Sequence, residues 1–332
     1  MGKNKKSARI MKKFDKNYKF NESHNKDKPL EVWFQDSEEG KILFIVFYTQ
    51  TCRWSQCLGC NLPSAMSENY IGFKHIIKQI DYIFKLPKVK KFKEIIKKVI
   101  VSNNGSVLDE RTFSSTALIY LIAMLNIHLK NLSIVSLETR PEYVDLSELE
   151  FLSRVLNEGE THTNLEIAIG FEAFDRHIRN KVFRKGLELR TFESLVKKLA
   201  NYKFNLKCYF MQKPVPGMGD KEAVEDIKKG IDYLSKVAKK HKVKINMHLN
   251  PTYVAKGTML EKEFRKGKYT PPQLIDVLRA VKYGRNKNIT IFVGLYDEHL
   301  AVKDGSFIRK GDQEILKKLQ KFNKTQDYNT LN

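Results

Sequence analysis

The sequence predicts an α/β fold in which parallel strands alternate with helices. Short runs rich in β-branched and aromatic residues recur along the chain, and the segments between them are long enough for helices. Several runs are apolar at consecutive positions, as in strands covered on both faces of a sheet. Polar residues follow the runs directly, which is where β/α folds place their active sites. A partial barrel and an open doubly wound sheet both satisfy these patterns, and the polar residues favour the barrel.

The elements follow in order along the chain. Residues 1–30 are expected to form a basic flexible arm, because residues 1–28 hold ten Lys or Arg and three acidic residues. The barrel domain is expected to span residues 31–300, with six or seven strands at 42–48, 97–103, 132–138, 165–172, 206–212, 243–250 and 289–296. The run at 117–125 predicts a buried helix, and the spacing of Ile76, Ile80 and Ile83 predicts another. Residues 301–332 are expected to be a helical C-terminal extension.

Composition limits the class of protein. A chain of 332 residues with 42% hydrophobic content can fill a large core, which argues against global disorder. The formal charge of +22 would attract a polyanion such as nucleic acid, although a lysine-rich solvated surface explains it equally well. We see no signal peptide, and the longest apolar run is far shorter than the roughly 20 residues of a membrane span. These patterns predict a cytoplasmic protein without a membrane partner.

Three of the four cysteines, Cys52, Cys57 and Cys60, lie in one loop after the first apolar run, with four and then two residues between them. This is too few cysteines for a disulfide framework. A structural zinc site normally needs a fourth ligand, and His75 and Cys208 are single. Three thiolates suit an iron-sulfur cluster with one open iron better than zinc. Buried structural thiols are a further alternative, and Cys208 is expected to be one.

At these residues the sequence resembles the radical S-adenosylmethionine (SAM) superfamily, whose fold is a partial (β/α)6 barrel of the TIM type. The usual spacing has three residues between the first two cysteines, and the four found here resemble a branch related to the elongator-type tRNA-modifying enzymes. The segments "VSNNGSVLDERTF", "LETRPEYVD" and "IAIGFEAFDRHIRNKVFRKG" extend the likeness. Residues 248–281 resemble the radical SAM subunit of archaeosine synthase.

The resemblance implies a site and a reaction. It implies a 4Fe-4S cluster on the three cysteines and SAM as cofactor. SAM would be bound by the turn at Asn104, Gly105 and Ser106 together with Glu138, Arg140 and Glu172, and the substrate by Lys213, His248 and Asn250. An ordinary salt bridge is the alternative role for Glu138 and Arg140, and a structural role is the alternative for His248.

The implied reaction is radical cleavage of a carbon-nitrogen bond in a lysine-modified 7-deazaguanosine of tRNA, which forms archaeosine. The implied partners are tRNA, the lysine-adding archaeosine synthase subunit and an external electron donor. The basic segment at residues 88–98 would then help to bind RNA. Two alternatives stay open: a radical SAM enzyme for another nucleoside or a small molecule, and a zinc-stabilised RNA-binding protein without catalytic activity.

Overall fold

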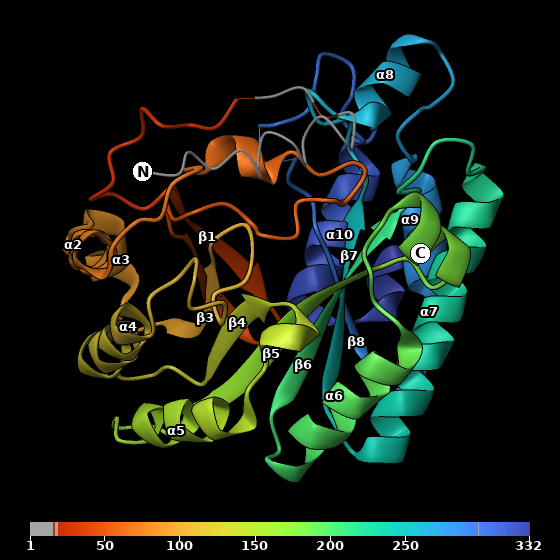
Figure 1. Ribbon diagram of the computed structural model, residues 1–332. Coiled ribbons are helices and arrows are strands. Elements are labelled where there is room, and N and C mark those ends of the chain that lie inside the picture. The colour runs from red at the N-terminus through yellow and green to blue at the C-terminus, as the bar shows by residue number, and fades with distance from the viewer. Residues whose placement is uncertain (1–15, 17–18, 298) are drawn as a thin grey trace.

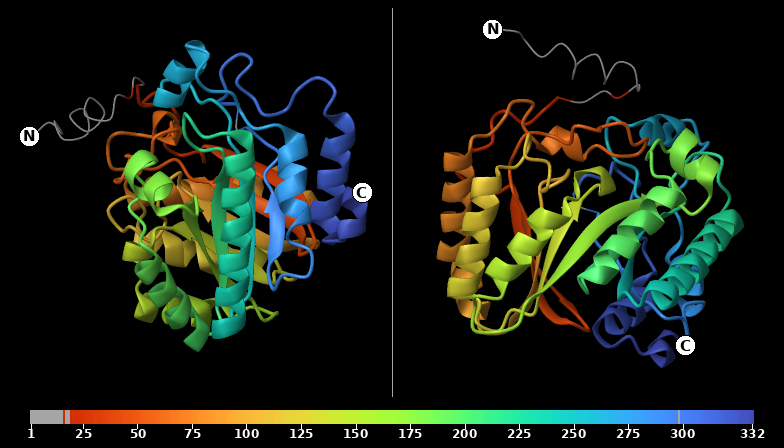
Figure 2. Two further views of the ribbon diagram at one scale, coloured as in Figure 1. Left: turned by 90° about the vertical axis from the view of Figure 1, so that its right-hand side faces the viewer. Right: turned by 60° about the horizontal axis from the view of Figure 1, so that its bottom comes forward.

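The computed structural model describes residues 16, 19–297 and 299–332, so most of the predicted basic arm lies outside the described residues. Eight strands form one sheet in the order β1 to β8. They are β1 (Glu31–Ser37), β2 (Gly40–Val46), β3 (Ile96–Ser102), β4 (Ile134–Thr139), β5 (Asn164–Glu172), β6 (Asn205–Gln212), β7 (Ile245–Pro251) and β8 (Thr290–Val293). Strands β2 to β8 are parallel, and β1 pairs antiparallel with β2. The sheet curls into the partial barrel that the sequence predicts (Figures 1 and 2).

Helices connect the strands, and most of them cover the outer face of the sheet, whereas α8 lies above the sheet in the view of Figure 1 (Figures 1 and 2). They are α2 (Phe73–Lys85), α3 (Pro87–Phe92), α4 (Ser115–His128), α5 (Leu146–Leu156), α6 (Leu189–Asn201), α7 (Asp220–His241), α8 (Met259–Arg265), α9 (Leu274–Lys282) and α10 (Gln313–Thr325). Short helical turns lie at Leu62–Ala65, Pro141–Tyr143 and Tyr328–Leu331, with a π-helix at His177–Val182. Ile76, Ile80 and Ile83 of α2, the apolar positions expected from the sequence, are buried in the main hydrophobic core of the protein. None of the helices in the described part of the chain has the length and hydrophobicity needed to cross a bilayer.

Strand β1 corrects the predicted count of six or seven strands. Its sequence, EVWFQDS, mixes polar and apolar residues, and each of its residues is only half-buried. It therefore lacks the continuous apolar pattern of the parallel strands. The hairpin that joins it to β2 turns at Gly40, whose φ of +101° is a conformation that glycine adopts without strain. The result is an antiparallel edge strand next to the first barrel strand.

Helix α10 covers the other edge of the sheet. Asn323 accepts a hydrogen bond from the Val293 N–H (2.8 Å) and donates one to the Val293 carbonyl (2.9 Å). Gln326 makes the same pair of bonds with Ile291 (3.0 and 2.7 Å). The two amide side chains thus replace a neighbouring strand for β8. The residues expected to be a C-terminal extension therefore pack directly on the sheet.

A charged network fills the barrel interior near the amino-terminal ends of the strands. Lys98 of β3 is fully buried, and its Nζ lies 2.8 Å from Glu166 and 2.6 Å from Glu39. Lys207 of β6 is also buried, but its hydrogen bond goes to the neutral Asn246 (3.0 Å). Burial, and then the charge of Lys98, lower the pKa of Lys207 to about 8. Because Lys98 is fully buried in this network, it cannot belong to an RNA-binding surface. This corrects the RNA-binding role expected for the end of the basic segment 88–98.

Candidate functional site

A cavity of about 300 Å³ opens at the carboxyl ends of the parallel strands. Ten of the twelve residues that the sequence assigns to a site line it: Cys52, Cys57, Cys60, Asn104, Gly105, Glu138, Arg140, Glu172, His248 and Asn250. The backbone topology explains this convergence, because parallel strands present all their carboxyl ends at one mouth. The other two, Ser106 and Lys213, do not line the cavity. Ser106 is buried, and Lys213 forms an ion pair with Asp220 (2.7 Å).

The cysteine loop is held in place by segments far away in the sequence. The Leu58 N–H donates to the carbonyl of Phe183 (2.9 Å), and Asn61 donates to the carbonyl of Lys256 (3.0 Å). Ser55 has a positive φ of +44° and its hydroxyl donates to the carbonyl of Cys52. The three thiols of the loop are free and all face the same cavity. A single loop therefore offers three thiol ligands to whatever occupies the mouth.

Burial raises the pKa of the Cys57 thiol and raises that of Cys60 to about 12. The charge of Lys185 acts against this effect on Cys57, and the charge of Lys16 acts against it on Cys60. Cys60 also feels the charges of Cys52 and Cys57, and Cys57 feels that of Cys52, so the three lie within electrostatic range of one another. In the described residues, no group of three or more His, Cys, Asp or Glu is arranged to hold a metal ion.

The turn after β3 packs directly on the cysteine loop. Asn104 has a positive φ of +53°, and its N–H bonds to the Ser102 hydroxyl (3.1 Å). A β-carbon on Gly105 would lie 3.2 Å from the Cα of Cys52, so glycine permits this close approach. The turn lies in the cavity wall with its backbone beside the first cysteine. Its carbonyls are suitable acceptors for an ammonium group.

The guanidinium carbon of Arg140 lies over the indole ring of Trp54, 4.3 Å from the ring centroid. Its Nη1 donates to the carbonyl of Lys185 (3.0 Å), and its Nε pairs with Glu142. The indole N–H donates in turn to the carbonyl of Arg184 (2.9 Å). These contacts fix a buried guanidinium at the cavity wall, where its remaining donors can bind a carboxylate.

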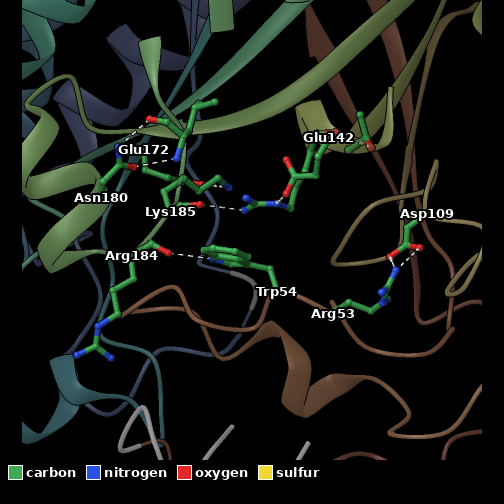
Figure 3. Close-up of polar contacts among 11 residues, drawn as sticks. Arg53, Trp54, Asp109, Glu142, Glu172, Asn180, Arg184 and Lys185 are labelled. Carbon is green, nitrogen blue, oxygen red and sulfur yellow. Dashed lines mark hydrogen bonds and ion pairs between the residues drawn. The ribbon is translucent and has the colours of Figure 1, made fainter. Parts of the chain in front are cut away.

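Two carboxylates complete this side of the wall. Glu172, at the end of β5, has a positive φ of +74° and forms an ion pair with Lys185 (2.8 Å, Figure 3). Burial acts to lower the pKa of Lys185, but Glu172 and Cys57 together outweigh burial, so the pKa is raised. Glu138 accepts a hydrogen bond from the hydroxyl of Tyr209, and burial raises its pKa. The site therefore offers one carboxylate in an ion pair and one bound to a neutral hydroxyl.

His248 lies deeper in the cavity, between the rings of Tyr209 and Phe292 (centroid distances of 4.8 and 4.9 Å). It is 6% exposed, and its Nδ1 has no hydrogen-bond partner among the described residues. Burial lowers the pKa of His248 well below its usual range, so the ring is neutral at physiological pH. A neutral imidazole offers one donor and one acceptor. The histidine thus suits a polar, uncharged group.

The cavity also contains residues that the sequence did not indicate. They are Trp33, Gln35, Trp54, Lys185, Tyr209, Tyr253 and Tyr296. Trp54 could have been found from its place inside the cysteine loop, and Lys185 from its place next to Gly186 in the basic segment after β5. Trp33 and Gln35 lie on β1, which the apolar pattern does not reveal.

Two archaeal proteins resemble this chain over most of its length. No family model matches the chain. An uncharacterized protein of Methanocaldococcus jannaschii is 29% identical over 93% of this chain and 84% of its own length. Archaeosine synthase subunit beta of Methanosarcina acetivorans is 28% identical over 73% of this chain and 67% of its own length. The chain is similar to this subunit. The resemblance to archaeosine synthase that the sequence indicates is therefore confirmed.

Solved structures resemble the fold. Elp3 of Methanocaldococcus infernus superposes with a TM-score of 0.49, at 14% identity, over 75% of this chain and 58% of its own. SuiB of Streptococcus suis, solved with S-adenosylmethionine bound, superposes with a TM-score of 0.48, at 13% identity, over 82% of this chain and 56% of its own. The chain thus spans somewhat more than half the length of either solved protein.

Proposed function

We propose that this protein is a radical SAM enzyme that holds a 4Fe-4S cluster on Cys52, Cys57 and Cys60. The observation that carries the proposal is that three free thiols of one loop share a cavity with a glycine turn and a fixed guanidinium. Three thiol donors fit a cluster that leaves one iron open. A cluster held by these thiols would supply one electron for the reductive cleavage of SAM, the chemistry that generates a radical able to take a hydrogen atom from a substrate.

The chain's own residues would bind and orient SAM. Its ammonium group would meet the backbone carbonyls of the turn at Asn104 and Gly105, and its carboxylate the guanidinium of Arg140. Glu138 and Glu172 are the wall carboxylates available to the ribose hydroxyls. Buried aromatic rings of the barrel interior would keep water away from the reacting groups. Ser106 would act only by supporting the turn, since its side chain is buried and does not line the cavity.

We propose further that the substrate is tRNA carrying a lysine-modified 7-deazaguanosine, and that the reaction breaks a carbon-nitrogen bond to leave the amidine of archaeosine. The similarity to archaeosine synthase subunit beta supports this substrate. The net charge of +22 supports a polyanionic partner, whose binding would weaken steeply with salt. His248 and Asn250 would contact the substrate. The remaining partners would be the lysine-adding subunit and an electron donor, all in the cytoplasm.

The test is anaerobic reconstitution of the protein with iron and sulfide, followed by incubation with SAM, a reductant and the lysine-modified tRNA. We expect free deoxyadenosine and methionine in solution, and archaeosine as the modified nucleoside in the tRNA. SAM cleavage with an intact lysine adduct would favour a paralogue that acts on another substrate. One equivalent of zinc without iron after anaerobic purification would favour the RNA-binding alternative. Cys57→Ala should lose both iron and SAM cleavage, whereas Cys208→Ala, in a buried strand position, should keep both.

A further inference from the structure

We propose that the cavity wall between β1 and the segment after β8 binds the planar base of the substrate. Trp33 would be the stacking surface, and Gln35 and Asn250 would hydrogen-bond the edge of the base. The identity of the base as a 7-deazaguanine rests on the proposed function. The presence of an aromatic and amide wall for a planar heterocycle rests on the geometry alone.

Strand β1 presents two side chains to the cavity. Trp33 and Gln35 both line it, while Phe34 between them faces the other side of the sheet and packs on Phe92. Alternate residues of a strand point to opposite faces, which explains this division. Trp33 stacks on Phe44 with a centroid distance of 4.1 Å and an interplanar angle of 12°. The indole orientation is thus fixed from one side.

A second, more exposed aromatic ring lies near Trp33. Tyr296, which follows β8, has its ring centroid 6.1 Å from that of Trp33 at an angle of 52°. Tyr296 is 42% exposed and packs edge-on against His299 (centroid distance 5.1 Å), so a partly solvent-accessible aromatic ring borders the indole. Aromatic side chains stack on bases regardless of sequence because every base has a π face. An indole with one supported face is therefore suited to hold a base.

The polar groups beside this ring are available for a ligand. In the part of the chain that the structure describes, we find no hydrogen bond to the side-chain amides of Gln35 or Asn250. A β-carbon on Gly294 would lie 2.1 Å from Asn250 Oδ1 and 3.1 Å from His248 Nε2, so this glycine makes room for both side chains. His248 adds an unpartnered buried Nδ1. An amide both donates and accepts, which matches the edge of a guanine-type base.

The position of this wall fits a substrate that is part of a large molecule. Strands β1 and β8 are the two ends of the sheet order and do not pair with each other. Helix α10 covers the gap between these two edges, since Asn323 bonds to β8 and its carbonyl accepts from the Glu38 N–H (3.0 Å), so the wall is reached through the cavity mouth at the carboxyl ends of the strands. A base extruded from a folded RNA can enter from there. The cysteine loop and Arg140 lie on the same cavity, so a base held here would be presented to the proposed SAM site.

The chain has two tryptophans, and this permits a direct test. Trp54→Phe leaves Trp33 as the single tryptophan, and Trp33→Phe leaves Trp54. Each full-length variant is titrated with 7-deazaguanosine, and its fluorescence is corrected for ligand absorption. We expect saturable quenching in Trp54→Phe and none in Trp33→Phe, with cytidine at least about tenfold weaker. Absence of quenching at Trp33, or equal quenching at Trp54, would overturn the assignment.

Two further variants separate base binding from folding. Phe34→Ala, made in the Trp54→Phe background, loses an aromatic ring of the same strand on the other face, and it should retain the quenching. Gln35→Leu should weaken the affinity for 7-deazaguanosine about tenfold, roughly the discrimination of one good amide-base contact. Thermal unfolding followed by circular dichroism identifies any variant that has lost its fold. Unchanged affinity in folded Gln35→Leu would contradict the hydrogen-bonding role.

Turnover distinguishes this proposal from the proposed function. If the wild type forms archaeosine, Trp33→Ala should raise the KM for the modified tRNA about tenfold, the lower range for loss of one stacking contact. Phe34→Ala, which removes the ring on the other face of the same strand, should keep the wild-type KM. An unchanged KM would defeat the base-binding wall and leave the proposed function standing. If the wild type forms no archaeosine, the proposed function fails, and the fluorescence titration still decides the wall.

Discussion

Lys185 Nζ lies 2.8 Å from Glu172 Oε1, and a β-carbon on Gly170 would lie 2.1 Å from that nitrogen and 2.2 Å from that oxygen. The ion pair therefore occupies the space that any larger residue at position 170 would need. Gly170 and Glu172 also flank a shift in the pairing of β5 with β6. The glycine, the shift and the positive φ of Glu172 together turn the end of the strand so that its carboxylate faces the cavity.

Gly170→Ala should disrupt this ion pair. We expect the free energy of unfolding to fall by about 3 kcal/mol, as when a buried ion pair is broken, and SAM cleavage to be lost. Urea denaturation and deoxyadenosine formation measure the two effects. Gly72→Ala is the matched control, because a β-carbon there would have no heavy atom within 4 Å, and it should cost less than about 1 kcal/mol. Equal behaviour of the two variants would contradict the prediction.

Arg140→Lys should impair SAM binding while it keeps the charge. A lysine cannot both stack on Trp54 and present a planar pair of donors to a carboxylate. We expect the KM for SAM to rise about tenfold, the value of roughly one charge-assisted hydrogen bond. Arg53→Lys is the control, since Arg53 pairs with Asp109 (3.0 Å) and does not line the cavity. A similar rise in both variants would show that the loop, and not the guanidinium, is responsible.

The two buried lysines of the barrel interior should respond differently to substitution. Lys98→Met leaves Glu166 buried without its partner and should lower the free energy of unfolding by about 3 to 5 kcal/mol. Lys207→Met removes a buried cation that bonds to a neutral amide and should raise the free energy of unfolding at pH 7 by about 1 to 3 kcal/mol. Urea denaturation at pH 7 tests both, and a loss of stability in both variants would contradict the second expectation.

The titration of Lys207 should also appear in the pH dependence of the free energy of unfolding. The pKa of Lys207 is about 8 in the folded protein, whereas an unfolded lysine titrates near 10.5. Between these values the unfolded chain binds more protons, so this residue makes the free energy of unfolding rise as pH increases from about 8 to 10.5. Below pH 8 its full destabilising effect is present. The free energy of unfolding of Lys207→Met should lack this rise. Urea denaturation of the wild type and the variant at pH 7, 8, 9 and 10 measures it, and an identical dependence on pH in both proteins would contradict the expectation.

Asn323→Ala should expose the edge of the sheet. It removes both hydrogen bonds to the buried backbone of Val293, and we expect a loss of about 2 to 4 kcal/mol. An unpaired edge strand also promotes association, so light scattering at raised protein concentration should increase. Gln320→Ala, an exposed position of the same helix, should change neither quantity. A stable, monodisperse Asn323→Ala protein would show that the two hydrogen bonds of Asn323 are not needed to protect the edge of β8.

The sequence predicts the parallel strands and the cavity residues that follow them because both depend on local pattern. Apolar runs mark buried strands, and topology alone brings the residues after them together, as it does for Glu138 and Asn250. Strand β1 escapes prediction because an edge strand is only half-buried and need not be apolar. Lys213 follows a strand end as expected, but its positive φ and its ion pair with Asp220 turn it from the cavity, and tertiary contacts decide both.

The partners of the predicted residues are harder to foresee. Arg140 and Glu172 are visible as polar residues at strand ends, but Trp54 and Lys185 reach them from other segments. Pairing over such separations depends on the exact path of the backbone. The stacking of Trp54 on Arg140, for example, requires Gly186, where a β-carbon would lie 2.7 Å from the indole. No periodicity in the sequence carries this information.

The anchors of the cysteine loop have a consequence for the lifetime of the enzyme. Hydrogen bonds from Leu58 to Phe183 and from Asn61 to Lys256 hold the loop through protein contacts alone. The conformational entropy of the loop is therefore already lost when the chain folds, before any metal binds. Zinc fingers differ, because they need their metal to fold. If the three thiols hold the proposed cluster, a protein that loses it to oxygen should therefore persist as a folded, empty scaffold. Such a scaffold can be refilled repeatedly instead of being degraded and made anew.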